Sequence, residues 1–369
     1  MRRRDFLQRT MALTVALTAP LQRLLKRGRL DEAAGLVQKF VDAGRLNAAV
    51  LHVRQDSHTF RRAFGEAKTP DTIFLLASIT KPMTAVGMMV LADRGELRLS
   101  DPVHKFIPEF TEGGRKFITI KHLLTHTSGL PDQLPENIEL RKRYAPLEEF
   151  VDRTIKVPLL FKPGARVEYQ SMGLLLAAEV AERITNTPFR RFLDETVFEP
   201  LGMTRTALGL GRFQIKDTVL SQADEADNLY GGGAEDTSGW NWNSPYWRDL
   251  GAPWGGAHST GPDLANLLQY FLDPDDRVLK KATAAAMLVN QNEGLDRPWG
   301  IGFELNSPLN TFGRACSPRT FGHSGATGTL AWADPATRLT CVILTTWPAR
   351  ASKDILITPV SDLVSESAG

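Results

Sequence analysis

Strand-like segments lie near both ends of this 369-residue chain, and helix-like segments fill its middle. Alternating apolar positions and turn residues predict strands in four ranges, 48–67, 299–305, 320–325 and 328–346. Apolar residues at helical spacing dominate the region between them. The pattern predicts an α+β fold: an antiparallel sheet built from N- and C-terminal strands and flanked by helices, with an inserted, mainly helical subdomain.

We expect residues 26–369 to form one domain around this sheet. Its sheet region covers about 30–75 and about 295–365, and its helical region covers about 80–290. Such a chain brings residues far apart in sequence to one cleft between the two regions, where binding sites are preferentially found.

Residues 1–22 have the form of an export signal. Arg3, Arg4, Phe6 and Leu7 precede a short apolar run, and this arrangement resembles a twin-arginine signal. The run is too short to span a bilayer, so no stable membrane span is expected. The sequence therefore predicts an exported protein, periplasmic or secreted, or a cytoplasmic one if the signal is not functional.

The composition and motifs exclude several classes of function. The chain has 44 basic and 42 acidic residues, a near-balance that gives no argument for nucleic acid as a partner. No H-E-x-x-H motif occurs, and the close pair His122 and His126 lacks the acidic neighbour of a metalloprotease site. Neither a phosphate-binding glycine loop nor a G-x-S-x-G elbow is present. We expect no metal and no cofactor.

Ser78 and Lys81 form an S-x-x-K pair at the start of a predicted helix. Residues three apart on a helix share a face, so the lysine could serve as the base for a serine nucleophile. The lysine pKa would then have to fall from about 10.4 toward 7. The alternative is a helix-capping serine beside an exposed lysine, and the spacing alone arises by chance roughly once or twice in such a chain.

Four further landmarks follow this pair in order. Together the five segments are 74–110 with "LLASITKP", 118–131 with "THTSGLP", 163–203 with "EYQSMG", 255–268 with "GGAHSTG" and 320–335 with "FGHSGATG". In this order they resemble the serine β-lactamase and penicillin-binding-protein superfamily, in its class C-like branch. That branch includes family VIII carboxylesterases, D-aminopeptidases and D-alanyl-D-alanine carboxypeptidases. The resemblance covers about residues 32–365.

The resemblance implies a mechanism for this chain. Ser78 would be the nucleophile that is acylated, and Lys81 would help to remove its proton. Tyr169 would shuttle protons to and from the leaving group. The backbone amides of Ser78 and Ala326 would form the oxyanion hole.

Two positions depart from the pattern of the family. Ser171 stands where the tyrosine motif often ends in Asn, and His323 stands where a Lys usually opens the third motif. With Ser324 and Gly325, these residues are expected to bind substrate. A neutral imidazole attracts a substrate carboxylate less than an ammonium does. The departures therefore favour an esterase, or a peptidase or amidase with a less anionic substrate, over efficient β-lactam hydrolysis.

Other functions stay open at this point. A D-amino-acid peptidase or amidase, or a β-lactamase, would use the same residues on a small peptide or β-lactam instead of an ester. A catalytically weak member would bind cell-wall peptides or a partner. Residues 231–256 contain four tryptophans among glycines and asparagines. This segment is either a lid or wall of the substrate cleft or a surface loop packed on itself.

Overall fold

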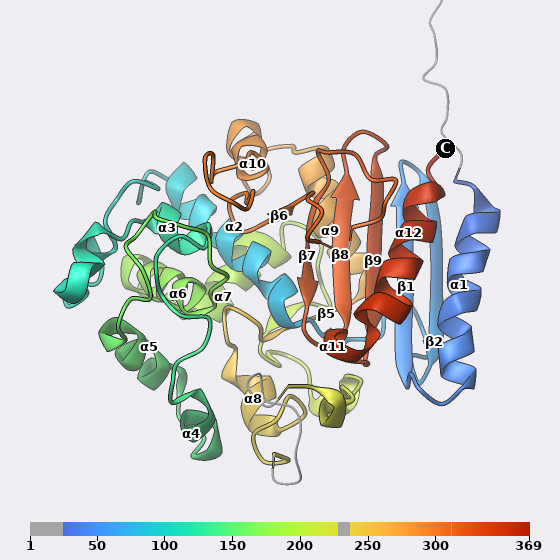
Figure 1. The fold of residues 1–369 in the computed structure, drawn as a ribbon, viewed down its shortest axis with the longest axis horizontal. Coiled ribbons are helices and arrows are strands. Elements are labelled where there is room, and N and C mark those ends of the chain that lie inside the picture. Colours follow the sequence, from blue (N-terminus) through green and yellow to red (C-terminus); the bar gives the residue numbers. More distant parts are fainter. Residues whose placement is uncertain (1–24, 228–236, 311) are drawn as a thin grey trace, which may run out of the picture.

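The computed structural model describes residues 25–227, 237–310 and 312–369. Six strands form one antiparallel sheet in the order β2-β1-β9-β8-β7-β6 (Figure 1). They are β1 Ala48–Gln55, β2 His58–Gly65, β6 Glu304–Leu305, β7 Phe321–Gly325, β8 Thr329–Asp334 and β9 Leu339–Thr345. Strands from the two ends of the described chain meet where β1 pairs with β9. The α+β fold expected from the sequence is confirmed.

Both faces of this sheet are covered by helices. On one face lie α1 (Arg27–Asp42) and α12 (Thr358–Glu366), and α9 (Gly261–Leu272) lies on the other (Figure 1). Along β8, Leu330 and Trp332 belong to the core under α1 and α12, whereas Ala331 and Ala333 belong to the core on the opposite face. Alternate residues of a strand point to opposite faces, so both sets are apolar in a sheet buried on both sides.

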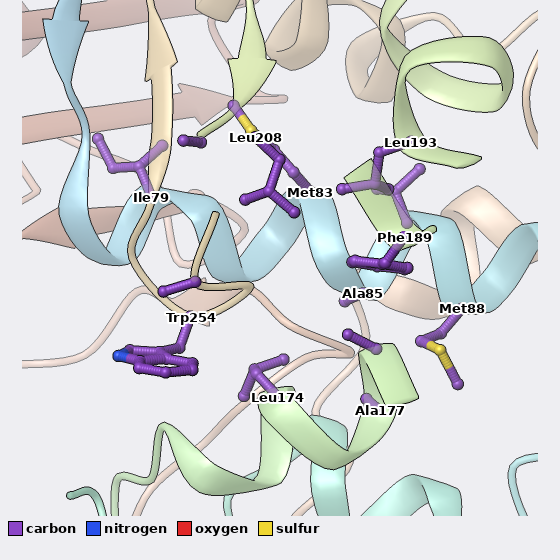
Figure 2. Close-up of a cluster of buried hydrophobic side chains, with 14 of the residues drawn as sticks. Ile79, Met83, Ala85, Met88, Leu174, Ala177, Phe189, Leu193, Leu208 and Trp254 are labelled. Atoms are coloured by element: carbon purple, nitrogen blue, oxygen red, sulfur yellow. The ribbon is translucent and has the colours of Figure 1, made fainter. Parts of the chain in front are cut away.

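The second region packs around α2 (Thr80–Asp93), whose residues are nearly all buried. Figure 2 shows apolar side chains of α6 (Met172–Thr185) and α7 (Phe189–Leu193) gathered around this helix. The other helices are α3 Ile120–Leu124, α4 Asn137–Lys142, α5 Leu147–Lys156, α8 Pro245–Leu250, α10 Lys281–Met287 and α11 Ala349–Ser352. A helix that is apolar all round belongs in the interior of a protein. Thus α2 lies in the interior of the helical region, packed against α6 and α7.

A second, three-stranded sheet was not expected from the sequence. It has the order β3-β5-β4, with β3 Phe74–Leu75, β4 Ala207–Leu208 and β5 Ala257–Ser259. Strands of two or three residues are too short to show an alternating pattern. This small sheet matters for the site because β3 leads directly into Ser78.

The proposed export signal at residues 1–22 lies outside the described residues. Of the helices that are described, none is both long and apolar enough to cross a membrane. Cys316 and Cys341 are free thiols. Within the same described ranges, no group of three or more His, Cys, Asp or Glu side chains is placed to hold a metal ion.

Replacing Gly328 by Ala is expected to destabilise the fold strongly. Gly328 closes the turn between β7 and β8 with φ +90°, and a Cβ built there would lie 1.9 Å from the backbone oxygen of Trp347. Strain at positive φ and this backbone clash together should lower the free energy of unfolding by about 3 kcal/mol or more. Urea unfolding followed by circular dichroism measures the change.

Gly294→Ala is the matched control for this substitution. Gly294 has φ +81°, but nothing lies within 4 Å of its built Cβ. It should show only the backbone strain, about 1 kcal/mol. Equal losses of stability in the two variants would contradict the close approach of Gly328 to the Trp347 carbonyl.

Candidate active site

Ser78 lies in a single 3-10 turn, Ala77–Ile79, between β3 and α2. Ala77 has φ +50°, a left-handed conformation that is costly for a residue with a Cβ. Two side chains hold the preceding strand: Thr327 Oγ1 donates to the Leu75 carbonyl at 2.8 Å, and Thr329 Oγ1 donates to the Leu76 carbonyl at 2.7 Å. The backbone before Ser78 is therefore anchored to the turn that follows β7 and to the first residue of β8.

Lys81 lies one turn after Ser78 and is 1% exposed. Its Nζ donates to Ser78 Oγ at 3.0 Å and to the Trp254 carbonyl at 3.0 Å. Burial lowers the lysine pKa to about 8, although the carboxylates of Asp132 and Glu304 oppose the shift. The lysine thus lies directly beside the serine hydroxyl, and its neutral form, which becomes populated as the pH approaches 8, can act as the base.

The pH dependence of ester hydrolysis should report this lysine. Only the neutral amine takes a proton, so kcat/KM should rise as pH increases through about 8 and then level off. At pH 6 we expect a value about a hundredfold below the plateau. The measurement is kcat/KM for a neutral ester between pH 5.5 and 9.5 at constant ionic strength.

Two neighbouring histidines are not expected to contribute to this pH profile. Burial lowers the pKa of His323 to about 3 and holds that of His126 well below its usual value. Both imidazoles therefore stay neutral across the assay range, so neither should change kcat/KM as the pH is varied. If kcat/KM instead rose between pH 6 and 7 and was constant above, the assignment of the base to Lys81 would be contradicted.

Tyr169 lies over the same lysine. Lys81 Nζ is 4.6 Å from the centroid of the tyrosine ring, and Tyr169 and Ser78 line one cavity. The His126 ring lies 4.7 Å from the tyrosine ring, centroid to centroid, and its Nδ1 accepts from the Gln170 amide at 3.1 Å. His126 therefore supports the tyrosine from behind and hydrogen-bonds the next residue in the chain.

His323 lies behind Tyr169 rather than in the wall of the cavity. It is 2% exposed, its ring centroid is 6.1 Å from that of Tyr169, and its Nδ1 donates to the Ser324 carbonyl at 2.7 Å. The next two residues of β7, Ser324 and Gly325, do line the cavity. A strand turns alternate side chains to opposite faces, so the histidine faces inward where Ser324 faces the cavity.

The cavity has a volume of about 320 Å³. Of the residues expected in the site, it is lined by Ser78, Tyr169, Ser171, Ser324, Gly325 and Ala326. Lys81 does not line the cavity itself but contacts Ser78, which does. His323 is not among the lining residues either. The structure thus brings all but these two expected side chains to one surface.

The tryptophan-rich segment forms one wall of this cavity. Trp242, Trp247 and Trp254 line it, and each is less than 5% exposed. Trp254 also supplies the carbonyl that accepts from Lys81. Of the two alternatives left open by the sequence, the described part of the segment fits a cleft wall. Residues 231–236 lie outside the described residues.

The two amides expected to form the oxyanion hole belong to residues that border the same cavity, Ser78 and Ala326. Gly325 permits this approach, because a Cβ built on it would lie 2.2 Å from the Leu76 carbonyl. Any larger residue would push the end of β7 away from the serine turn. The third motif therefore needs a glycine at this position, because the backbones of Gly325 and Leu76 approach too closely for a side chain.

Charged side chains that sequence reasoning missed also border the cavity: Asp132, Arg141, Arg297 and Glu304. Ser171 Oγ donates to Asp132 Oδ1 at 2.6 Å. Glu304 is buried, which raises its pKa, and it accepts from Ser324 Oγ at 3.4 Å. Asp132 directly follows the recognisable segment 118–131, and that position was the one available signal for it.

The chain matches a protein-family model, described as "Beta-lactamase", over residues 33–363. A protein of Escherichia coli (strain K12) with the provisional name D-alanyl-D-alanine carboxypeptidase is 26% identical over 363 residues, covering 87% of this chain and 82% of that protein.

Two solved structures share the fold. The D-amino acid amidase of Ochrobactrum anthropi SV3 has a TM-score of 0.73 at 22% identity and covers 92% of this chain and 98% of its own. A family VIII carboxylesterase has a TM-score of 0.72 at 20% identity, with coverages of 92% and 96%. At this level of identity the likeness concerns the fold. With the family match across nearly the whole chain, the conclusion is that this protein belongs to the β-lactamase family and is a hydrolase.

Proposed function

We propose that the protein hydrolyses carboxylic esters through an acyl-enzyme on Ser78. The observation that carries the proposal is the contact of Lys81 Nζ with Ser78 Oγ at 3.0 Å, together with the lowered pKa of this buried lysine. A nucleophile beside a base at hydrogen-bonding distance, in a cavity, is the arrangement that acyl transfer requires.

The reaction would proceed in two halves. Lys81 takes the Ser78 proton while Oγ attacks the ester carbonyl, and the amides of Ser78 and Ala326 stabilise the resulting oxyanion. When the tetrahedral intermediate collapses, the ester C–O bond breaks and the proton passes through Tyr169 to the departing alcohol. Water then attacks the acyl-enzyme, gives its proton to the same groups, and releases the carboxylic acid with Ser78 restored.

The absence of a charged lysine at the start of the third motif favours esters over anionic substrates. His323 occupies the position of the usual lysine, and burial lowers its pKa to about 3, so it supplies no positive charge at neutral pH. Three tryptophans offer an apolar wall to an acyl or alcohol group. The relatives named above include an esterase, which supports the proposal.

Amide or peptide hydrolysis is the second candidate, and Asp132 is the observation that favours it. A carboxylate in the cavity suits substrates that carry an amino group, as amides and peptides of amino acids do. The relatives with names of this kind are an amidase and a carboxypeptidase.

A side-by-side assay tests the proposal. A fluorophosphonate should leave a mass adduct on the tryptic peptide that contains Ser78, and p-nitrophenyl butyrate should be turned over faster than nitrocefin or a D-alanyl peptide. An adduct on another serine would defeat the mechanism. Faster turnover of the peptide than of the ester would transfer the proposal to the second candidate.

We also propose that residues 1–22 direct export through a twin-arginine route, on the grounds of Arg3, Arg4, Phe6 and Leu7. Fractionation of cells expressing the full chain should recover it outside the cytoplasm, and the Arg3→Lys, Arg4→Lys double variant should stay inside. The same distribution for both proteins would contradict the proposal.

A further inference from the structure

His126 fixes the backbone on both sides of Tyr169. The amide of Glu168 donates to the His126 carbonyl at 2.9 Å, and the amide of Gln170 donates to the imidazole Nδ1 at 3.1 Å. The same residue thus holds one neighbour of the tyrosine through its main chain and the other through its side chain. A shift of His126 would therefore move both residues that flank the tyrosine.

The side chain of His126 also packs against the tyrosine ring. His126 is 1% exposed, and its ring centroid lies 4.7 Å from that of Tyr169 and 4.5 Å from that of Trp299. The centroids of Tyr169 and Trp299 are 6.1 Å apart, so the three rings form one packed group. Lys81 Nζ lies 4.6 Å from the centroid of the tyrosine ring. The imidazole and the lysine thus both lie against the ring that carries the tyrosine hydroxyl.

Other residues of the loop that contains His126 hold the same short segment. Gln170 is fully buried, its Nε2 donates to the His122 carbonyl at 3.1 Å, and its Oε1 accepts from Ser128 Oγ. Residues 122–128 therefore hold residues 168–170 through the main chain and through a buried side chain. Tyr169 lies in the middle of the segment that is held in this way.

Two properties of His126 indicate that it positions its neighbours and does not transfer a proton. Its φ of +61° is left-handed, a costly conformation for a residue with a Cβ, and such strain is concentrated at functional sites. Glycine would adopt this conformation freely but offers neither a ring nor a side-chain acceptor. Burial lowers the pKa of His126 well below its usual value, and its Nδ1 already accepts from the Gln170 amide. The imidazole therefore stays neutral and serves as an acceptor for the backbone.

We infer that His126 is a positioning residue, which holds Tyr169 where the tyrosine hydroxyl protonates the departing alcohol. The inference rests on the proposed acyl-enzyme at Ser78 and on the proton path through Tyr169. It adds a residue that determines the range of leaving groups that the enzyme accepts.

The leaving group of the substrate reports the position of the tyrosine. Tyr169 gives its hydroxyl proton to the ester oxygen as the C–O bond breaks, and the proton that Lys81 took from Ser78 then restores the tyrosine. An alkoxide is a poor leaving group and needs this proton, whereas p-nitrophenolate departs as a stable anion without it. A displaced tyrosine should therefore slow acylation by alkyl esters and spare acylation by p-nitrophenyl esters.

Two butyrate esters test the inference because they share one acyl group. The leaving-group ratio is kcat/KM for p-nitrophenyl butyrate divided by kcat/KM for ethyl butyrate, with acid release followed for the ethyl ester. Tyr169→Phe should raise this ratio about a hundredfold or more. His126→Phe keeps a ring but loses the acceptor for the Gln170 amide, and it should raise the ratio about tenfold or more. His126→Asn keeps an acceptor and tolerates the left-handed backbone, so it should raise the ratio less than His126→Phe does.

His122→Asn is the matched control. His122 lies in the same segment of the chain, and its Nδ1 likewise accepts a backbone amide, that of Thr119 at 3.2 Å. It does not line the cavity, so its substitution should leave the ratio unchanged. Both rates are measured on one preparation, so partial unfolding of a variant would lower them equally and would not alter the ratio.

An unchanged ratio in His126→Phe would overturn the inference, even if both rates fell, and so would an equal rise in His122→Asn. Failure of the underlying mechanism would look different. An unchanged ratio in Tyr169→Phe would defeat the proton path of the proposed function, and the inference with it. A ratio raised in Tyr169→Phe but not in His126→Phe would overturn the inference alone.

Discussion

Ser78→Ala should lower kcat/KM for p-nitrophenyl butyrate by at least about 10⁴-fold. The serine supplies the atom that forms the covalent bond, and removing the nucleophile of a serine hydrolase removes nearly all of the rate that its neighbours assist. Initial rates with purified protein, at equal concentrations of the wild type and the variant, measure the loss.

Ser57→Ala, prepared in the same way, serves as the control for this experiment. Ser57 is an exposed residue in the turn between β1 and β2, at the end of the sheet opposite β6 and β7, and it does not line the cavity. It should keep full activity. If Ser78→Ala retained more than about one per cent of the wild-type rate, the acyl-enzyme mechanism would be wrong.

Lys81→Met should separate activity from stability. Methionine fills a similar volume without a charge, so kcat/KM should fall by about 10³-fold or more while the midpoint of thermal unfolding stays level or rises. The rise is expected because burial disfavours the charged form of this lysine. Rates and thermal unfolding are measured on the same preparations.

Lys81→Arg sharpens the test because it keeps a cation at the site. A guanidinium does not lose its proton at accessible pH, so this variant should be about as slow as Lys81→Met and should lack the rise in rate near pH 8. Substantial activity in Lys81→Arg would show that the site needs a positive charge and not a base.

The main sheet could be predicted from the sequence because its strands carry their own signal. In β1, β8 and β9, apolar residues and turn residues mark both the strands and the hairpin at Asp334-Pro335. The small sheet carries no such signal. Its strand β5 is three residues long and precedes a strong helical pattern, so only its pairing with β3 and β4 defines it.

The residues of the candidate site likewise fall into those that a local motif predicts and those that only the folded structure identifies. Ser78, Lys81 and Tyr169 lie in local motifs, so their sequence context pointed to them before any contact was known. Asp132 has no signal beyond its position after segment 118–131 and Glu304 has none, and only the folded chain brings both to the cavity of the serine. The side of β7 that His323 occupies likewise depends on the register of the sheet, which a slip of one residue would reverse.

The pairing of β1 with β9 also bears on the order in which the molecule can fold. Ala49 lies opposite Thr345, so this pairing of the second and third strands of the sheet joins residues far apart in the sequence. Contacts this distant along the chain form slowly, because a long loop must close first. Until β9 emerges, β1 and β2 form an isolated hairpin, which is marginally stable at best in water. The nucleophile is therefore synthesised well before β7 and β9, and it acquires its working surroundings only after both strands have emerged.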